Sequence, residues 1–119
     1  MDKYELQSRT KKIALEIICL TETFPKNSAS FVIEKQIIRS ATSVAANYRS
    51  LTRAKSKADF INKLCIIEEE ADETLFWLEL IKELNIANND KIDILYKETN
   101  EILSIIVSAK KTMKNKSNL

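Results

Sequence analysis

The sequence predicts an all-α protein, an up-down-up-down antiparallel four-helix bundle formed by one domain over residues 1–119. Apolar side chains recur every three or four residues through four long segments, which is the spacing of one helix face. The chain contains no glycine and one proline, so the tight turns of β-hairpins are not expected. The segments are joined by short connections, which place successive helices side by side in opposite directions.

The first helix is predicted over residues 3–22, because Leu6, Ile13, Ile17 and Leu20 share one face. It ends before Pro25, since a proline pushes the preceding residue out of the α region. The second helix is predicted over residues 28–53, with an N-cap between Asn27 and Ser30. Its core stripe consists of Ile33, Ile37, Val44, Tyr48 and Leu51.

The third helix is predicted over residues 57–85, and Ser56 with Asp59 forms the capping pattern at its start. Its core stripe is predicted to consist of Phe60, Leu64, Ile67, Ala71, Thr74, Leu75 and Leu78. A second apolar stripe lies roughly opposite, which indicates that the helix is covered on two sides. We predict that this second stripe is an oligomer interface formed by Ile66, Phe76, Trp77, Leu80 and Leu84.

Phe76 and Trp77 are adjacent, so one helix cannot bury both side chains on a single face. One of them is expected in a subunit interface, where aromatic residues are enriched. The alternative is that Trp77 packs on a neighbouring helix of the same bundle.

The fourth helix is predicted over residues 90–114, with Asn88 or Asn89 as its N-cap. Its core face is expected to contain Ile92, Tyr96, Thr99, Leu103, Ile106 and Lys110. The basic tail that follows is expected to fray, and its lysines complement the negative end of the helix dipole.

Charge is distributed very unevenly along a chain whose net charge is only +2. Residues 1–57 hold 11 Lys and Arg against 5 Asp and Glu, whereas residues 58–101 hold 4 against 12. The last 18 residues hold 4 lysines and no acidic residue. Such separation steers a polyanion to one surface. The alternative is a set of solvated helix faces that complement one another within the bundle.

The candidate nucleic-acid-binding residues form a basic face on the second helix and the turn after it. Arginine suits this role because its planar fork binds a phosphate through two hydrogen bonds. The alternative is pairing with the acidic third helix, where Glu68 to Glu73 hold five carboxylates. The predicted residues are Lys35, Arg39, Arg49, Arg53, Lys55 and Lys57, joined in a wider version by Lys11 and Lys12.

Several functional classes find no support in the residues. The chain has no histidine to act as a catalytic base, so we expect no enzyme activity. No metal site is predicted, since successive carboxylates on a helix point about 100° apart. No glycine-rich phosphate loop and no cofactor are expected. Cys19 and Cys65 are isolated in apolar helical patterns and are predicted to be buried thiols.

The sequence also lacks the marks of export or membrane insertion. The N-terminal segment is polar and has no apolar signal region. No apolar run approaches the ~20 residues that a membrane-spanning helix needs. The expected location is therefore the cytoplasm.

Residues 36–47, QIIRSATSVAAN, carry a resemblance to a known family. The family motif has Gln, then Arg three residues on, Ser four further and Asn four beyond, and here these are Gln36, Arg39, Ser43 and Asn47. The stretches DFI at 59–61 and IEEEADETLFWLE at 67–79 also match. On these motifs the chain resembles the four-helix bundles encoded in intervening sequences of bacterial 23S ribosomal RNA genes, which include the accessory variability protein of diversity-generating retroelements.

Two differences from the family pattern limit which family features are expected in this chain. Many members have Ile-Pro where this chain has Val44-Ala45, and Ala-Glu-Gly where it has Tyr48-Arg49-Ser50. The second helix is therefore expected to continue without a kink, and no glycine-dependent turn is expected here.

The resemblance implies a ring-shaped homo-oligomer, by analogy a pentamer. The polar residues Gln36, Ser43 and Asn47 are themselves expected to let two helices approach and to hydrogen-bond across the gap, and the alternative is a recognition surface. The retroelement member binds a reverse transcriptase and nucleic acid. The candidate partners are therefore RNA or DNA, a reverse transcriptase or another protein, and further copies of the chain. Three hypotheses remain: a nucleic-acid-binding oligomer, an adaptor that docks a partner enzyme, and an orphan bundle without a dedicated ligand.

Overall fold

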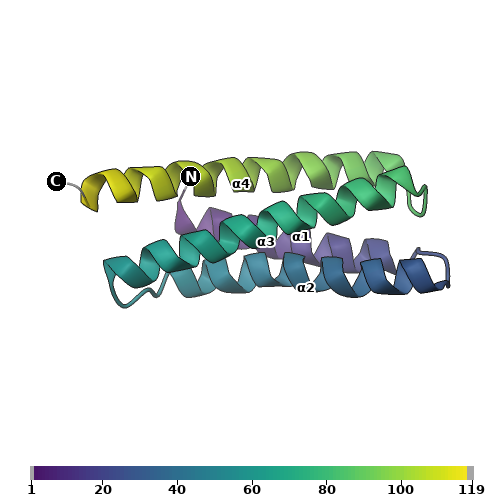
Figure 1. Ribbon diagram of the computed structural model, residues 1–119, viewed down its shortest axis with the longest axis horizontal. Helices are drawn as coiled ribbons and strands as arrows, with labels where there is room; N and C mark the ends of the chain where they lie inside the picture. The colour runs from purple at the N-terminus through teal and green to yellow at the C-terminus, as the bar shows by residue number, and fades with distance from the viewer. Residues whose placement is uncertain (1, 118–119) are drawn as a thin grey trace.

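The chain folds into four helices, α1 (Lys3–Thr21), α2 (Ser28–Leu51), α3 (Lys57–Glu83) and α4 (Asn89–Ser117), in a computed structural model that describes residues 2–117. Successive helices run in opposite directions and form an elongated bundle (Figure 1) with principal extents of 52 × 23 × 20 Å. Each helix packs on the next, whereas α1 and α4 touch only lightly. Residues 2–117 contain no strand, so the predicted all-α class is confirmed.

The core follows the predicted faces of the first three helices. Ile17, Ile37, Leu64, Ile67 and Leu78 are completely inaccessible to solvent. In α4 the buried face is rotated slightly from the predicted one. Leu95 and Ile102 are buried there, while the predicted core residues Tyr96, Leu103 and Lys110 are only half-buried.

Side-chain caps fix the beginnings of the helices as predicted. The Asn27 side chain accepts a hydrogen bond from the Ser30 amide, and the Asn88 side chain accepts one from the Lys91 amide. Each bond satisfies one of the amides that a helix N-terminus leaves without a partner. Of the two asparagines considered for α4, Asn88 is therefore the N-cap.

The helix ends differ from the predicted ones by one to three residues. The last turn of α2 tightens, since the Arg53 and Ala54 amides donate to the carbonyls three residues earlier, and the helix ends at Leu51. By contrast, α4 continues beyond residue 114 to Ser117.

An asparagine takes the place of glycine where α3 ends. Asn85 adopts φ 54°, the left-handed region that favours glycine. The Asn85 amide donates to the Lys82 carbonyl (3.1 Å) and the Ile86 amide donates to the Ile81 carbonyl (3.3 Å). These two bonds form a Schellman motif, so the lack of glycine does not prevent a tight α3–α4 connection.

We expect Asn85→Ala to lower the free energy of unfolding by about 1 kcal/mol, because the left-handed region is costly for a residue with an ordinary side chain. Asn85→Gly is the matched control and should leave stability unchanged or slightly raised. Urea unfolding of both variants measures the difference. Equal stabilities for the alanine and glycine variants would show that the conformation at residue 85 carries no cost.

The prediction of two buried thiols was wrong. Cys19 is exposed and Cys65 is half-buried, and both are free. Cys19 follows the buried Ile17 by two residues, which turns it about 200° away from the core. Within residues 2–117 no helix is long and apolar enough to cross a membrane.

Candidate nucleic-acid interface

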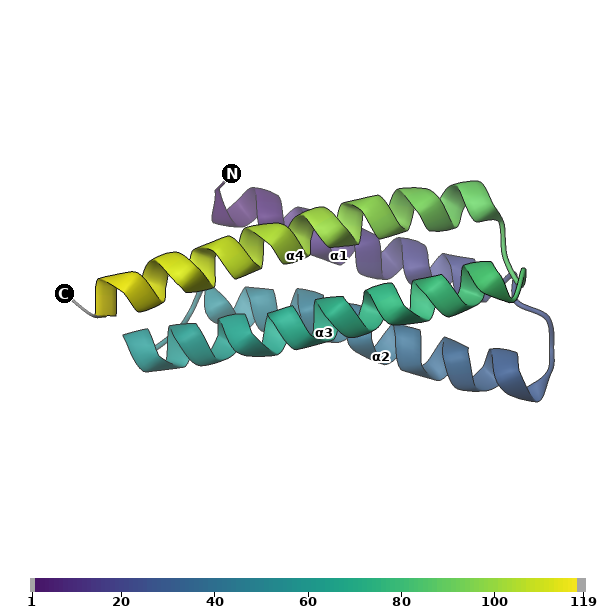
Figure 2. The same cartoon turned by 45° about the horizontal axis from the view of Figure 1, so that its top comes forward.

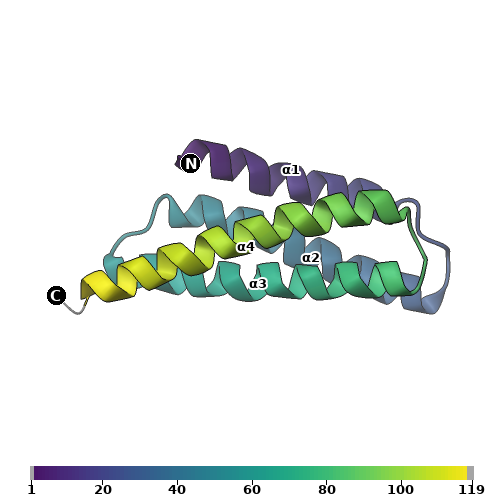
Figure 3. The ribbon, with the colours of Figure 1, turned by 90° about the horizontal axis from the view of Figure 1, so that it is seen from above.

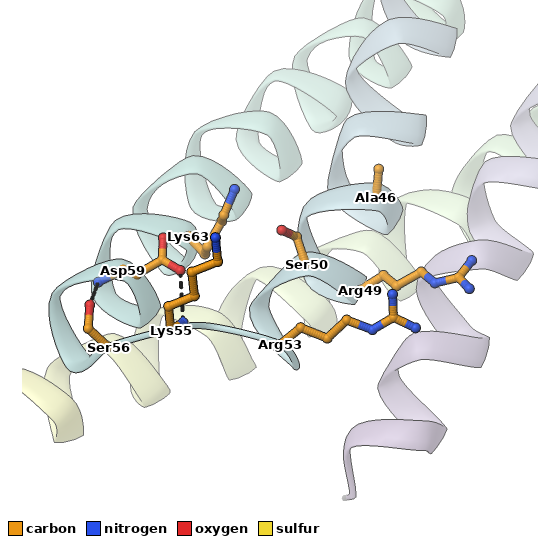
Figure 4. Close-up of a pocket in the computed structure, with 8 residues that line it drawn as sticks. All are labelled: Ala46, Arg49, Ser50, Arg53, Lys55, Ser56, Asp59 and Lys63. Atoms are coloured by element: carbon orange, nitrogen blue, oxygen red, sulfur yellow. Dashed lines mark hydrogen bonds between the residues drawn. The ribbon is translucent and has the colours of Figure 1, made fainter.

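The last turns of α2 and the first turns of α3 enclose a hollow with four cationic side chains, Arg49, Arg53, Lys55 and Lys63. In Figure 4 the two arginines extend along one side of the hollow, the two lysines lie on the other side near Asp59, and Ser50 lies between them. We call this surface the basic hollow. Its remaining lining residues are Ala46 and Ser56.

The basic hollow contains a single carboxylate, and that carboxylate is engaged by the backbone. The Ser56 side chain accepts a hydrogen bond from the Asp59 amide (3.1 Å), and the Asp59 carboxylate accepts one from the Lys55 amide (3.1 Å). In the usual capping box the carboxylate would accept from the amide of the N-cap residue, here Ser56. In this protein it accepts from the amide of Lys55, one residue earlier. Within the described part of the chain, none of the four cationic side chains forms an ion pair.

The topology adds further positive charge at the same end of the bundle. The C-terminal ends of α2 and α4 and the N-terminal ends of α1 and α3 lie together (Figure 1). We call residues 2–5, 46–68 and 108–116 the basic end, and they hold 10 Lys and Arg against 4 Asp and Glu. Since the whole chain has a net charge of +2, the rest of the protein is negative. The bundle is therefore polarised along its long axis.

The predicted basic face of α2 is divided by the structure. Arg39 donates to Glu70 of α3 (2.9 Å) and to Glu73, so this arginine joins two helices. Pairing of the acidic run with Arg39, considered as an alternative above, is thus what the structure shows. Lys35 is exposed but precedes Arg49 by 14 residues, which separates them by about 21 Å along the helix.

The other predicted cations lie outside the basic hollow. Lys57 is exposed at the first position of α3, within the basic end. Lys11 and Lys12 are exposed in the middle of α1, and Lys12 approaches Glu16 of the same helix (3.9 Å).

Lys63 is the residue of the basic hollow that sequence reasoning missed. It lies within residues 58–101, where acidic residues outnumber cationic ones by 12 to 4. Its spacing carried a signal, because Lys63 follows Asp59 by four residues and therefore lies on the same face of α3.

Two cationic clamps tie α4 to the bundle. Lys110 bonds to Glu68, and this hydrogen bond raises the pKa of Lys110. Arg9 bonds to Glu101 and Glu98, with the hydrogen bond to Glu101 the main cause that raises the pKa of Arg9. When folding raises the pKa of a cation, the charged group stabilises the fold. The full stabilisation is present at pH values below the pKa of the group in the unfolded chain, and it is lost as the pH rises through the pKa in the folded protein. Both clamps are therefore intact at neutral pH.

The polar motif residues of α2 lie along its border with α3. Asn47 donates to the carbonyl and the hydroxyl of Ser43 (2.9 and 3.0 Å), and Gln36 accepts from Arg39 (3.4 Å). These bonds stay within α2. Bonds that do cross to α3 are those of Arg39 to Glu70 and Glu73, and one between two buried hydroxyls, which Thr74 donates to Ser40 (2.8 Å).

The predicted interface stripe of α3 is partly exposed. Phe76 and Leu84 are 49% and 52% exposed, whereas Ile66, Trp77 and Leu80 are half-buried. The Trp77 ring packs against the core and meets the Phe76 ring edge-on, with centroids 4.9 Å apart. Trp77 thus packs within its own bundle, and Phe76 is the more accessible of the two aromatic residues.

Val32 extends this apolar surface, and sequence reasoning did not include it. Val32 is 57% exposed and precedes Arg39 by seven residues, so both lie on the same face of α2. Because Arg39 pairs with Glu73 and the helices are antiparallel, Val32 lies level with the turn of α3 that follows Glu73. We call Val32, Phe76, Leu80 and Leu84 the apolar strip.

No metal site competes with these surfaces among residues 2–117, where no group of three metal-ligating side chains comes together. The carboxylates of α3 are instead used in pairs with Arg39 and Lys110.

Comparison with known proteins places the chain in a family. The family model described as 23S rRNA-intervening sequence protein matches residues 2–108. The chain is also similar to the crystal structure of a protein with unknown function from the S23 ribosomal protein family of Bacteroides thetaiotaomicron VPI-5482, with a TM-score of 0.83 and 34% identity. That match covers 93% of this chain and 99% of the other. No curated protein matches. Because the family model spans most of the sequence, the chain belongs to the family of 23S rRNA-intervening sequence proteins.

Proposed function

We propose that this protein is a non-enzymatic helical bundle that binds nucleic acid, as RNA or within a ribonucleoprotein, through its basic end. The observation that carries the proposal is the basic hollow, where four cationic side chains without ion-pair partners in residues 2–117 face one carboxylate. Cations that the fold itself employs, such as Arg39, are paired with carboxylates. The unpaired ones are available to neutralise phosphates.

Self-association is the second part of the proposal. The apolar strip exposes Val32, Phe76 and Leu84 by about half each, and exposed apolar surface of this kind is typical of protein interfaces. The strip lies toward the α3–α4 connection, away from the basic end. A ring of copies, a pentamer by the family resemblance, would therefore leave the basic ends accessible and multiply the phosphate contacts.

An adaptor function is the alternative, and the apolar strip supports it too. In that case the strip docks a partner protein, such as a reverse transcriptase, and the basic end serves assembly. The two functions differ in their response to salt. For phosphate binding, the logarithm of the association constant falls linearly with the logarithm of the salt concentration. Apolar docking does not show this dependence.

We expect affinity for a short RNA to fall by about a hundredfold between 50 and 200 mM salt if each chain makes about four phosphate contacts. Fluorescence anisotropy with a labelled RNA measures the slope. Light scattering with and without the same RNA reports the mass of the oligomer and its gain on binding. A particle that gains no mass with RNA at low salt would overturn nucleic-acid binding and favour the adaptor. A monomer would overturn self-association.

A further inference from the structure

A second, apolar groove lies at the basic end, between the last turns of α4 and the start of α3. It is a shallow, open hollow of about 600 Å³, formed mostly by α4 with Phe60 as its one residue from α3, and its apolar side consists of Phe60, Ile105, Ala109 and Met113. Figures 2 and 3 show that α4 extends past the N-terminal end of α1, so α1 does not run alongside the last turns of α4. We call this surface the Phe60 groove.

The polar groups of the Phe60 groove are hydroxyls and one carboxylate. Ser104, Ser108 and Thr112 line it from α4. The carboxylate belongs to Glu101 and is neutralised by Arg9 (3.1 Å). The interior of the groove therefore offers an aromatic ring, aliphatic side chains and neutral hydrogen-bonding groups.

Within residues 2–117 no cationic side chain lines the Phe60 groove itself, but helical spacing places two lysines of the basic end on the same helix faces as groove residues. Lys57 precedes Phe60 by three residues, and Lys116 follows Thr112 by four, so each lies on the groove face of its helix. Phe60 also lines a neighbouring hollow with Lys3 and Ala54. An apolar groove at the cationic end of the bundle is complementary to a ligand that joins flat apolar rings to a chain of phosphates.

We propose that the Phe60 groove receives unpaired nucleotides, with a base against the Phe60 ring and the adjoining phosphates on the lysines of the basic end. The inference rests on the proposed function and narrows its ligand to single-stranded RNA or DNA segments, such as a loop or an end. A duplex keeps the faces of its bases stacked inside, so its phosphates reach the basic hollow but it offers no base face to the Phe60 groove. Stacking on an aromatic ring tolerates every base because each has a π face.

We expect Phe60→Leu to weaken binding of a labelled twelve-nucleotide oligouridylate by about five- to tenfold, the loss of one stacked base. Binding of a duplex of equal length should not change, because leucine preserves the apolar contact with the core. Phe60→Tyr keeps the aromatic face and should restore single-strand affinity. Thermal unfolding of each variant confirms that the helices remain folded.

A second measurement locates the contact directly. An oligouridylate with 4-thiouridine at its centre, irradiated in complex with the wild-type protein, should crosslink to peptides containing Phe60 or Met113. Crosslinks elsewhere, or equal loss of single-strand and duplex affinity in Phe60→Leu, would overturn the inference. If single-strand affinity is unaffected while the salt slope persists, the groove proposal fails and the proposed function stands. If neither nucleic acid binds, the proposed function fails. A loss of oligomer mass in Phe60→Leu would assign the groove to a second copy of the chain and overturn the inference as well.

Discussion

An Arg49→Glu, Arg53→Glu variant is expected to bind RNA about a hundredfold more weakly than the wild type near 0.1 M salt. Each phosphate contact is worth close to a factor of ten at this ionic strength through counterion release, and the two glutamates add repulsion. The slope of the logarithm of affinity against the logarithm of salt concentration should also fall by about 2, since two phosphate contacts are lost. Neither arginine forms an ion pair within residues 2–117, so the fold loses no partner.

The matched control for this experiment is Lys11→Glu, Lys12→Glu. It changes the net charge by the same amount, but the two lysines are exposed in the middle of α1, away from the basic hollow. Loss of RNA affinity confined to the arginine variant assigns binding to the basic hollow. Equal losses in both variants would mean that the net charge alone attracts RNA, and the hollow would then have no special role.

The second large effect concerns stability. We expect Trp77→Ala to lower the free energy of unfolding by about 2–4 kcal/mol. The Trp77 ring packs against the core of its own bundle, and truncation of a large aromatic side chain leaves a cavity. Chemical denaturation followed by circular dichroism measures the cost, since Trp77 is the only tryptophan and its fluorescence disappears with it.

The adjacent Phe76→Ala is the matched comparison. Phe76 is half-exposed on the apolar strip, so its truncation should cost less than about 1 kcal/mol in the isolated chain but lower the mass of the oligomer. The expected results are therefore opposite for two neighbouring residues. If Trp77→Ala dissociates the oligomer without destabilising the chain, the tryptophan is an interface residue, and the division of the two rings between core and strip is wrong.

The cations of the bundle divide into those with an ion-pair partner and those without one in residues 2–117. Arg9, Arg39 and Lys110 join helices through carboxylates and contribute to the fold. The cations of the basic hollow have no such partners in residues 2–117. The same residue types thus join helices at some positions and line the basic hollow without an ion-pair partner in residues 2–117 at others.

Much of the fold was determined by the sequence alone. The spacing of Ile33, Ile37 and Val44 specifies a helix face whatever surrounds it, because the α-helix has a fixed period. The caps at Asn27 and Ser56 likewise depend only on residues three positions apart. Local geometry of this kind involves no distant partner, so it can be predicted from the chain.

Only the tertiary structure decided which cations form a site. Arg39 and Arg49 belong to the same predicted basic face, but α3 presents Glu70 and Glu73 opposite Arg39 and no carboxylate partner opposite Arg49. Lys63 and Arg49 line the same hollow across the α2–α3 border, and the antiparallel topology places the C-terminal end of α4 at the same end of the bundle. The Phe60 groove likewise combines Phe60 of α3 with the last turns of α4. These features require residues far apart in sequence to meet, and helical periodicity within one segment carries no information about such meetings.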